Sequence, residues 1–432
     1  MTTTRRSFLA GVAPAVALPV FSGRAFAQEP QGSGSAAHPP AIAALKDRRS
    51  EAVPITSAER EARIARAREL MEKDGIAAIC IAGGTTLNYF CGVRWGNSER
   101  LMVVVIPVKG QPFGVCPAFE EGRLQERLAL VPAMAQTRLY TWQEDESPYD
   151  RVATGLKDLG LTSGTIGVEE TMPYVFADGV GRALPQVKVV NARPVTVGCR
   201  SIKSPGELAL MQLANNVTLA VYEAAWRSGQ PGMSTHEFSA LIGAGYERAG
   251  FPGEASCEVG EYSALPHGSI KPQTIRENTI VLIDDGCTVE GYQSDISRTF
   301  VYGKPSDKMR QCFDIVHRAQ ATALATARPG VACEAVDAAA RKVITDAGFG
   351  PGYAHFTHRV GHGIGMDGHE WPYLVGGNKL PLAAGMTFSD EPGIYLLGEF
   401  GVRLEDDMYI TEEGAKLFTG PSLSLEEPFA KG

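Results

Sequence analysis

The feature that most constrains the fold of this chain is a set of four carboxylates and one imidazole spread between positions 284 and 405. In chain order these are Asp284, Asp295, His362, Glu391 and Glu405. Carboxylates with an imidazole form a hard, oxygen-rich ligand set that can hold two divalent ions about 3.5–4 Å apart. A fold that uses this set must bring distant segments into one pocket. The pattern therefore indicates a two-metal hydrolase.

The two aspartates lie on either side of a predicted hairpin. Asp284 ends an apolar run that predicts a buried strand over 279–284, and Gly286 and Gly291 turn the chain before Asp295. Asp285 is an alternative to Asp284, because neighbouring side chains of a strand point to opposite faces. A polar turn would be the simpler interpretation if this segment stood alone.

Histidines cluster in the next segment. Four of the eight histidines, at 355, 358, 362 and 369, fall within fifteen residues, which favours a site over separate structural roles. Glycines at 361, 363 and 365 argue against a helix and favour close backbone approach. The segment 363–368 formally matches the dinucleotide fingerprint, but no βαβ pattern surrounds it.

Both glutamates lie on or beside predicted strands: Glu391 directly after the strand over 386–390, and Glu405 within the strand over 402–410. Glu391 precedes a Pro-Gly turn that would aim its carboxylate inward. Glu405 begins an acidic run that continues through Asp406 and Asp407. The simpler interpretation of Asp406 and Asp407 is a solvent-exposed charged edge. Each of these motifs is weak evidence alone. Their presence together in the order Asp, Asp, His, Glu, Glu is what indicates a metal site.

These motifs resemble the pita-bread metallopeptidase family, which includes methionine aminopeptidase, aminopeptidase P and prolidase. The match covers about 201–421, and the preceding region is similar to the N-terminal domain of the aminopeptidase P, prolidase and creatinase branch. The resemblance implies an α/β two-domain fold, with a small creatinase-like N-terminal domain and an α+β, pseudo-two-fold catalytic domain. It also implies hydrolysis of Xaa-Pro bonds by a metal-bridging hydroxide, as in aminopeptidase P or Xaa-Pro dipeptidase.

The resemblance assigns the ligands by motif. Asp284 would chelate one metal, Asp295 and Glu405 would bridge both, and His362 and Glu391 would complete the shell. The two ions are expected to be manganese first, with cobalt, zinc and iron as alternatives.

Further roles follow from the same resemblance. His267 is similar to the family's proton-handling histidine, and His358 and His369 would flank the substrate. His369 would also help to stabilise the oxyanion, Glu391 would shuttle the proton, and Arg403 would brace the ligands.

Two positions depart from the family pattern. Asp390 stands where relatives usually carry an apolar or small residue. Some prolidases place a carboxylate-binding arginine just after the His-Glu-x-Pro segment, whereas here Tyr373 follows and Lys379 is the nearest basic residue. Peptides longer than Xaa-Pro therefore remain candidate substrates.

Two other interpretations stay open. One is a non-catalytic pita-bread protein that binds partners, although such relatives have lost ligands that this chain keeps. The other is a creatinase-like or lyase reaction on a small non-peptide substrate, because a fold alone does not fix function. Activity that survives chelation would favour a metal-free route.

The N-terminus predicts a twin-arginine signal peptide over residues 1–27. Arg5 and Arg6 precede a short apolar stretch, and Ala25 and Ala27 supply the small-x-small cleavage pattern. The stretch is too short to span a bilayer and is interrupted by proline, so no stable membrane anchor is expected. We expect a periplasmic or secreted protein.

Composition and capping signals set the remaining boundaries. A tether rich in Gly, Ser, Ala and Pro predicts a disordered linker over 28–54, followed by an N-terminal domain over 55–198 and a catalytic domain over 199–425. Capping boxes at Thr56–Glu59 and Ser204–Glu207 each begin a helix.

The overall composition is that of a globular protein, with 44% hydrophobic and 21% charged residues. A net charge of −8 without a basic stretch argues against nucleic acid as a partner. Eight scattered cysteines predict small buried side chains rather than a disulfide framework. Proline-containing peptides are the expected partners, and a homodimer is possible.

Overall fold

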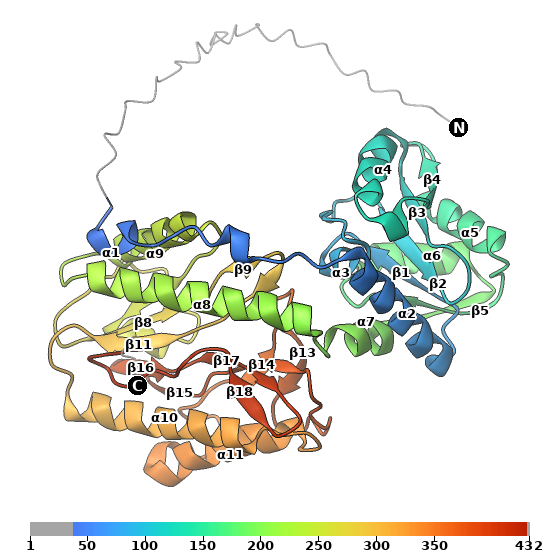
Figure 1. The fold of residues 1–432 in the computed structure, drawn as a ribbon. Coiled ribbons are helices and arrows are strands. Elements are labelled where there is room, and N and C mark those ends of the chain that lie inside the picture. The colour runs from blue at the N-terminus through green and yellow to red at the C-terminus, as the bar shows by residue number, and fades with distance from the viewer. Residues whose placement is uncertain (1–37, 430–432) are drawn as a thin grey trace, which may run out of the picture. The chain divides into compact units, whose positions relative to one another are not determined.

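The computed structural model describes residues 38–429. The predicted signal peptide at 1–27 and the first part of the predicted linker, 28–37, lie outside the described residues. Figure 1 shows the order of the helices and strands from α1 to β18. None of the helices in the described part of the chain is both long and apolar enough to cross a bilayer. The eight cysteines are buried and unpaired, as expected.

The expectation of a disordered linker is wrong for residues 38–54. This segment contains α1 (Pro40–Ala43) and a short 3₁₀ helix (Arg49–Glu51). Ile42 is fully buried, and the backbone N–H of Arg48 donates to the carbonyl of Ala249 at 3.0 Å. The segment is ordered because one apolar side chain and hydrogen bonds to a later helix fix it, which local composition cannot show.

The N-terminal domain is built on a mixed sheet of order β4-β3-β2-β1-β5-β6. β1 and β2 pair antiparallel at its centre, while β1–β5, β5–β6 and β3–β4 are parallel. The central strands are buried along their whole length, which matches their continuous apolar sequence. The strands are β1 (Ala78–Ala82), β2 (Val103–Pro107), β3 (Phe113–Pro117), β4 (Arg138–Trp142), β5 (Gly164–Val168) and β6 (Val187–Asn191).

Helices pack around this sheet. The first begins as expected, since the hydroxyl of Thr56 accepts from the N–H of Glu59 at 3.2 Å and the Glu59 carboxylate accepts from the N–H of Thr56 at 2.8 Å. It ends at Gly75, whose φ of 66° is left-handed. The helices are α2 (Ser57–Asp74), α3 (Thr85–Cys91), α4 (Glu121–Ala129), α5 (Pro148–Asp158), α6 (Tyr174–Ala183) and α7 (Arg193–Arg200).

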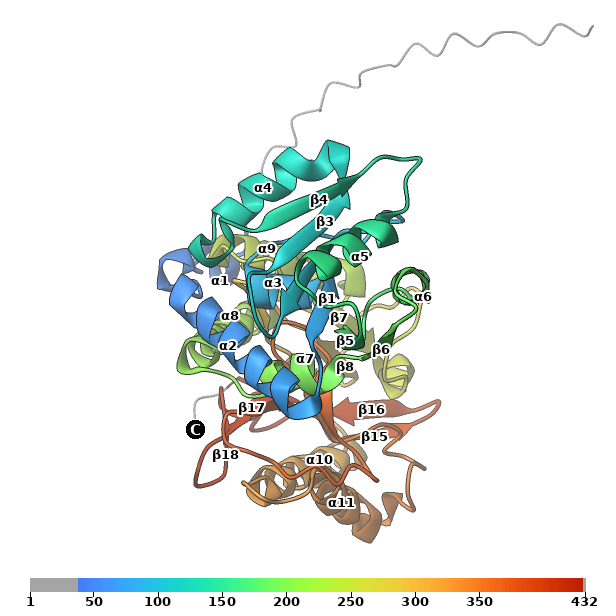
Figure 2. The same ribbon diagram turned by 90° about the vertical axis from the view of Figure 1, so that its right-hand side faces the viewer.

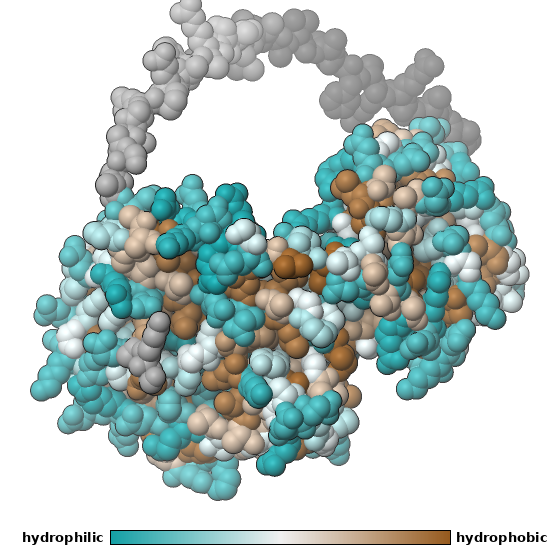
Figure 3. Space-filling model, in the orientation of Figure 1, coloured by the Kyte–Doolittle hydropathy of each residue, from teal (hydrophilic) through white to brown (hydrophobic). Residues whose placement is uncertain are grey.

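The catalytic domain pairs helices with small curved sheets. Its helices are α8 (Pro205–Ser228), α9 (Thr235–Ala249), α10 (Asp307–Thr326) and α11 (Cys333–Ile344). Figure 2 shows α10 and α11 side by side. The main sheets have the orders β7–β8–β11 and β13–β12–β14–β17–β18, where β13 spans Glu370–Leu374 and β18 spans Ala415–Leu417. The hairpins β9–β10 and β15–β16, with β15 at Gly393–Leu396, complete the set. Most of the face drawn in Figure 3 is hydrophilic.

Candidate metal centre

Two of the predicted ligands come from the first sheet and the hairpin beside it. Asp284 ends β8 (Ile280–Asp284), which pairs with β7 (Ser256–Val259) and β11 (Arg298–Val301). The chain then turns through β9 (Thr288–Val289) and β10 (Tyr292–Gln293), so that Asp295 returns beside Asp284. The predicted hairpin is confirmed.

The other three ligands come from the second sheet. His362 lies in β12 (Gly361–Gly363), Glu391 directly follows β14 (Thr387–Asp390), and Glu405 lies between two further strands. The strand predicted over 402–410 is wrong as a single element. It divides into β16 (Phe400–Arg403) and β17 (Asp406–Ile410), which join different sheets.

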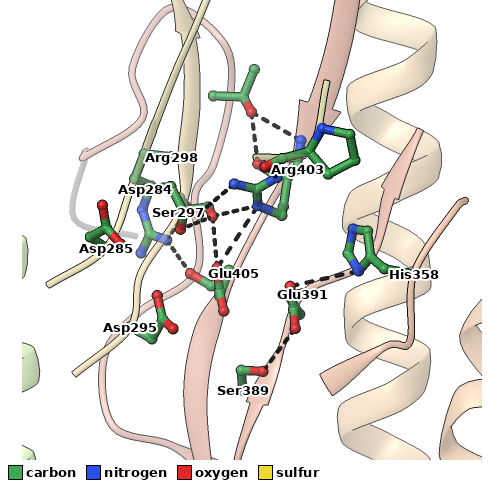
Figure 4. Close-up of polar contacts among 12 residues, drawn as sticks. Asp284, Asp285, Asp295, Ser297, Arg298, His358, Ser389, Glu391, Arg403 and Glu405 are labelled. Carbon is green, nitrogen blue, oxygen red and sulfur yellow. Dashed lines mark hydrogen bonds and ion pairs between the residues drawn. The ribbon is translucent and has the colours of Figure 1, made fainter. Parts of the chain in front are cut away.

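The five side chains converge. One oxygen each from Asp284, Asp295 and Glu405 lies within 4.8 Å of the others, and so do ligand atoms of His362, Glu391 and Glu405. Nε2 of His362 lies 3.4 Å from Oε1 of Glu391 and 3.7 Å from Oδ2 of Asp295. Figure 4 shows the carboxylates of Asp295, Glu391 and Glu405 around a common space. Glu405 belongs to both groups, which suits a carboxylate that two ions share.

All nine predicted site residues line one cavity of about 390 Å³. It contains the five ligands together with the residues expected to handle protons and substrate. Arg359, which sequence reasoning did not assign, also lines it. The cavity residues outside the five ligands are Pro266, His267, His358, Arg359, His369, Val375 and Arg403.

The electrostatics of these residues fit divalent cations. Burial, and then the neighbouring carboxylates, raise the pKa of Asp295 and Glu405 well above the ordinary range. Burial also raises the pKa of Glu391 to about 7 and lowers that of His362 to about 3, which keeps this imidazole neutral. Crowded buried acids beside a neutral imidazole are a donor set that bound cations would stabilise.

Arg403 and Ser297 hold two ligands in place. Nη2 of Arg403 donates to Oδ2 of Asp284 at 2.5 Å, and its Nε donates to the Ser297 hydroxyl at 2.8 Å. That hydroxyl lies 2.6 Å from Oδ1 of Asp284 and 2.7 Å from Oε2 of Glu405. Although burial opposes it, the Arg403 guanidinium lowers the pKa of Asp284 below its ordinary value. Sequence reasoning missed Ser297, because the position of a serine two residues after Asp295 does not reveal that its hydroxyl contacts other ligands.

His369 presents a hydrogen-bond donor to the cavity. Its ring stacks on that of His362 with centroids 3.7 Å apart, and Nη2 of Arg359 lies 3.0 Å from its Nδ1. A guanidinium only donates, so Nδ1 accepts and the proton resides on Nε2. His369 is therefore a neutral donor that can face a developing negative charge.

The other two histidines occupy opposite environments. His358 is held by Tyr395, whose hydroxyl lies 2.7 Å from its Nε2, and burial lowers the pKa of this histidine to about 3. His267 lies exposed at the cavity wall, where the preceding carbonyl of Pro266 accepts from Arg403 at 3.1 Å.

The expectation of a solvated acidic edge at Asp406 and Asp407 is wrong, because both are fully buried. Arg298 donates to Asp406 at 2.6 Å, and the N–H of Asp295 donates to Asp407 at 2.9 Å. Partners more than a hundred residues away therefore bind both carboxylates, while Oδ1 of Asp407 has no hydrogen-bond partner among the described residues.

Asp390 points away from the metal ligands. The hydroxyl of Ser389 lies 3.3 Å from Oε1 of Glu391, so these two side chains lie on the same face of the strand. The side chain of Asp390, between them, therefore points to the opposite face. It is fully buried, with no hydrogen-bond partner for its carboxylate oxygens among the described residues. Burial, and then Asp406, raise the pKa of Asp390 well above the ordinary range.

An arginine from the loop before β12 lies near the position where some prolidases carry theirs. Cζ of Arg359 lies 4.1 Å from the ring centroid of Tyr373, the residue that stands where an arginine was expected. Arg359, not Lys379, lines the cavity. The nearest basic residue in sequence is thus not the nearest in space.

Comparison with known proteins gives two family matches. Residues 209–412 match metallopeptidase family M24, and residues 63–202 match the creatinase/prolidase N-terminal domain. The chain is 35% identical over 344 residues to a probable dipeptidase PepE of Mycobacterium tuberculosis, covering 79% of this chain and 89% of the relative. It is 32% identical over 359 residues to an Xaa-Pro dipeptidase of Lactobacillus helveticus, covering 80% of this chain and 93% of the relative.

Solved structures agree. Dipeptidase PepE from Mycobacterium ulcerans superposes with a TM-score of 0.80 at 34% identity, covering 87% of this chain and 99% of that one. A prolidase from Thermococcus sibiricus gives 0.75 at 30% identity, covering 83% and 96%. The predicted two-domain fold is confirmed. This chain belongs to metallopeptidase family M24, with a creatinase/prolidase N-terminal domain before its metal-binding catalytic domain.

Proposed function

We propose that this enzyme hydrolyses the bond between an N-terminal residue and proline in short peptides. The observation that carries the proposal is one cavity that combines five converging ligands with a neutral histidine donor and an arginine. Several relatives named Xaa-Pro dipeptidase support the substrate class. The retained ligand set argues against a purely binding role.

When bound, two divalent ions sharing a water lower its pKa from about 16 towards neutrality and supply the nucleophile. Glu391 would accept a proton from the attacking water and deliver it to the departing nitrogen. Its carboxylate is suitably placed, with Oε1 3.4 Å from His362 and Oε2 3.7 Å from His358. The nitrogen of proline belongs to a tertiary amide and must be protonated to leave, so this step needs a positioned acid.

His369 and Arg359 hold the substrate. The Nε2 proton of His369 stabilises the negative charge that develops on the peptide oxygen. The Arg359 guanidinium pairs with no carboxylate in residues 38–429; its partners are His369 and the ring of Tyr373. An uncommitted guanidinium in a cavity is suited to the free carboxylate of a dipeptide.

The metal and the cellular location are part of the same proposal. Carboxylate-rich ligands favour manganese, with cobalt, zinc and iron as alternatives. The twin-arginine pattern directs the protein out of the cytoplasm as a folded chain, loaded with metal before transit. Replacement of Arg5 and Arg6 by lysine should leave active enzyme in the cytosol, and unchanged periplasmic activity would refute the route.

The test is reconstitution. Metal-stripped protein is reloaded with manganese, cobalt, zinc or iron and assayed on Ala-Pro, Ala-Pro-Ala and Ala-Ala. We expect metal-dependent cleavage before proline and little cleavage of Ala-Ala. Failure with every ion, or full activity in the presence of a chelator, would overturn the proposal.

A further inference from the structure

A second cavity, of about 320 Å³, meets the metal cavity at His369, which lines both. One wall is formed by Trp371 and Tyr373 of β13 (Glu370–Leu374). Another is formed by Asn191, at the end of β6, and Arg193, at the start of α7, both in the N-terminal domain. The strand positions explain the first wall, because Trp371 and Tyr373 are half-buried while the alternate residues of β13 are buried.

A series of contacting aromatic and guanidinium groups runs from the lining of one cavity to the lining of the other. Arg359, which bonds to His369, lies over the ring of Tyr373. Trp371 meets Tyr373 edge to face, with centroids 5.2 Å apart. Cζ of Arg193 lies 4.0 Å from the centroid of Trp371. The series leads outward from the metal centre and ends on Arg193.

Most charged side chains that line the second cavity already have hydrogen-bond or ion-pair partners within the protein. Asp367 and Glu370 both accept from Arg200, at 2.7 and 2.5 Å, and Glu170 accepts from the hydroxyl of Thr196 at 2.7 Å. Arg193 is different, because no carboxylate pairs with its guanidinium anywhere in the described chain; its side chain is exposed and rests on Trp371.

We propose that the second cavity is a subsite for residues that follow proline in longer substrates, with Arg193 binding their C-terminal carboxylate. This inference rests on the proposed Xaa-Pro hydrolysis. A dipeptide would end at Arg359. Each further residue adds up to about 3.5 Å of extended chain, which carries the carboxylate past His369 towards Trp371 and Arg193. The flat indole offers the added side chain an apolar surface.

The test compares peptides that differ only beyond proline. Values of kcat/KM are measured for Ala-Pro, Ala-Pro-Ala and Ala-Pro-Ala amide with the metal-loaded wild type and Arg193→Gln. We expect the variant to lower kcat/KM for Ala-Pro-Ala by about 10–100-fold, mainly through KM, since a charge-assisted hydrogen bond is lost. Ala-Pro and the amide should change less than about twofold, because neither places a carboxylate at Arg193.

Two controls separate binding from folding. Arg138→Gln is the matched variant, since Arg138 is also an exposed arginine stacked on an aromatic ring, that of Tyr140, but does not line the cavity. It should leave all three substrates unchanged. Arg193→Lys keeps the charge and should restore part of the preference for the free acid.

Three results would overturn the subsite: an equal loss on Ala-Pro and Ala-Pro-Ala, an equal loss on acid and amide, or no loss at all. A wild type that cleaves Ala-Pro but not Ala-Pro-Ala would also overturn it, while leaving Xaa-Pro hydrolysis intact. A wild type that cleaves none of the peptides with any ion would overturn the proposed function and this inference together.

Discussion

Arg403 on β16 donates a hydrogen bond of 2.5 Å to Asp284 on β8, and both side chains lie at the wall of the metal cavity. The contact joins residues from two different sheets. Because Arg403 holds the carboxylate of Asp284 ionised and oriented, it acts on the metal without being a ligand.

Replacement of Arg403 by methionine should weaken binding of divalent ions by about 10–100-fold, because Asp284 loses its brace and its pKa rises. Calorimetric titration of the stripped protein with manganese measures this. Arg403→Lys keeps the charge but loses the bidentate geometry of the guanidinium. Its affinity for divalent ions should therefore lie between those of the wild type and the methionine variant. Wild-type affinity in the methionine variant would show that Ser297 alone orients Asp284.

The proton shuttle can be tested at Glu391. Glu391→Gln keeps the shape and one oxygen but cannot carry a proton, so turnover of Ala-Pro should fall by about 10²–10⁴-fold. Metal content, measured by atomic emission, should largely remain. Glu399→Gln serves as the control, because Glu399 is an exposed glutamate paired with Lys308. A wild-type rate in Glu391→Gln would assign the shuttle to another group.

The segment that carries His369 is clamped by two buried cations. Arg200 pairs with Asp367 and Glu370, which lie on either side of His369 in sequence, and Lys203 pairs with Glu370 at 2.5 Å. Arg200→Met should lower the free energy of unfolding by about 1–3 kcal/mol, because Asp367 loses its cationic partner and the buried Glu370 keeps only Lys203.

The same variant should lower kcat more than it changes metal content, since a displaced His369 no longer meets the developing charge. Urea unfolding and steady-state kinetics measure the two effects. Arg66→Met removes an exposed ion pair with Glu69 and should change stability by less than about 0.5 kcal/mol. Equal behaviour of the two variants would contradict the clamp.

Glu169 should make stability depend on pH. Burial raises its pKa from 4.5 to about 7, and its Oε2 has no hydrogen-bond partner in the described structure. The folded state therefore favours the protonated carboxyl. This destabilisation is absent below about pH 4.5, grows as pH rises from there to about 7, and stays at its full value of about 3 kcal/mol above that.

Glu169→Gln should remove this part of the pH dependence. Its carbonyl oxygen can still accept from the N–H of Ala82, as Glu169 does at 2.8 Å. Urea midpoints of wild type and variant should coincide near pH 4.5, and the variant should be the more stable at pH 8. Parallel pH profiles would show that the pKa of Glu169 is the same in the folded and unfolded states.

The convergence of the five predicted ligands can be predicted from the sequence because each stands at a strand end or turn with its own local signal. Asp284 follows an apolar run, and Glu391 precedes Pro-Gly. The sequence analysis does not predict helix α9 (Thr235–Ala249), although Ser234 and Glu237 form a capping box and Gly250 ends the helix in a left-handed conformation.

Other features depend on contacts that no local pattern records. Asp406 is buried because Arg298 reaches it from another sheet, and residues 38–54 are ordered because later helices cover them. Arg359 enters the cavity through its stacking on Tyr373. Long-range partners decide these outcomes, and spacing along the chain does not reveal them.

The ligands come from two separate sheets, Asp284 and Asp295 from one side and His362, Glu391 and Glu405 from the other. Bound ions would therefore link the two halves of the catalytic domain and stabilise their association. A ligand that binds only the native state raises stability in proportion to the logarithm of its concentration. Melting temperature should then rise with added manganese, and heat tolerance becomes a direct gauge of how fully the centre is occupied.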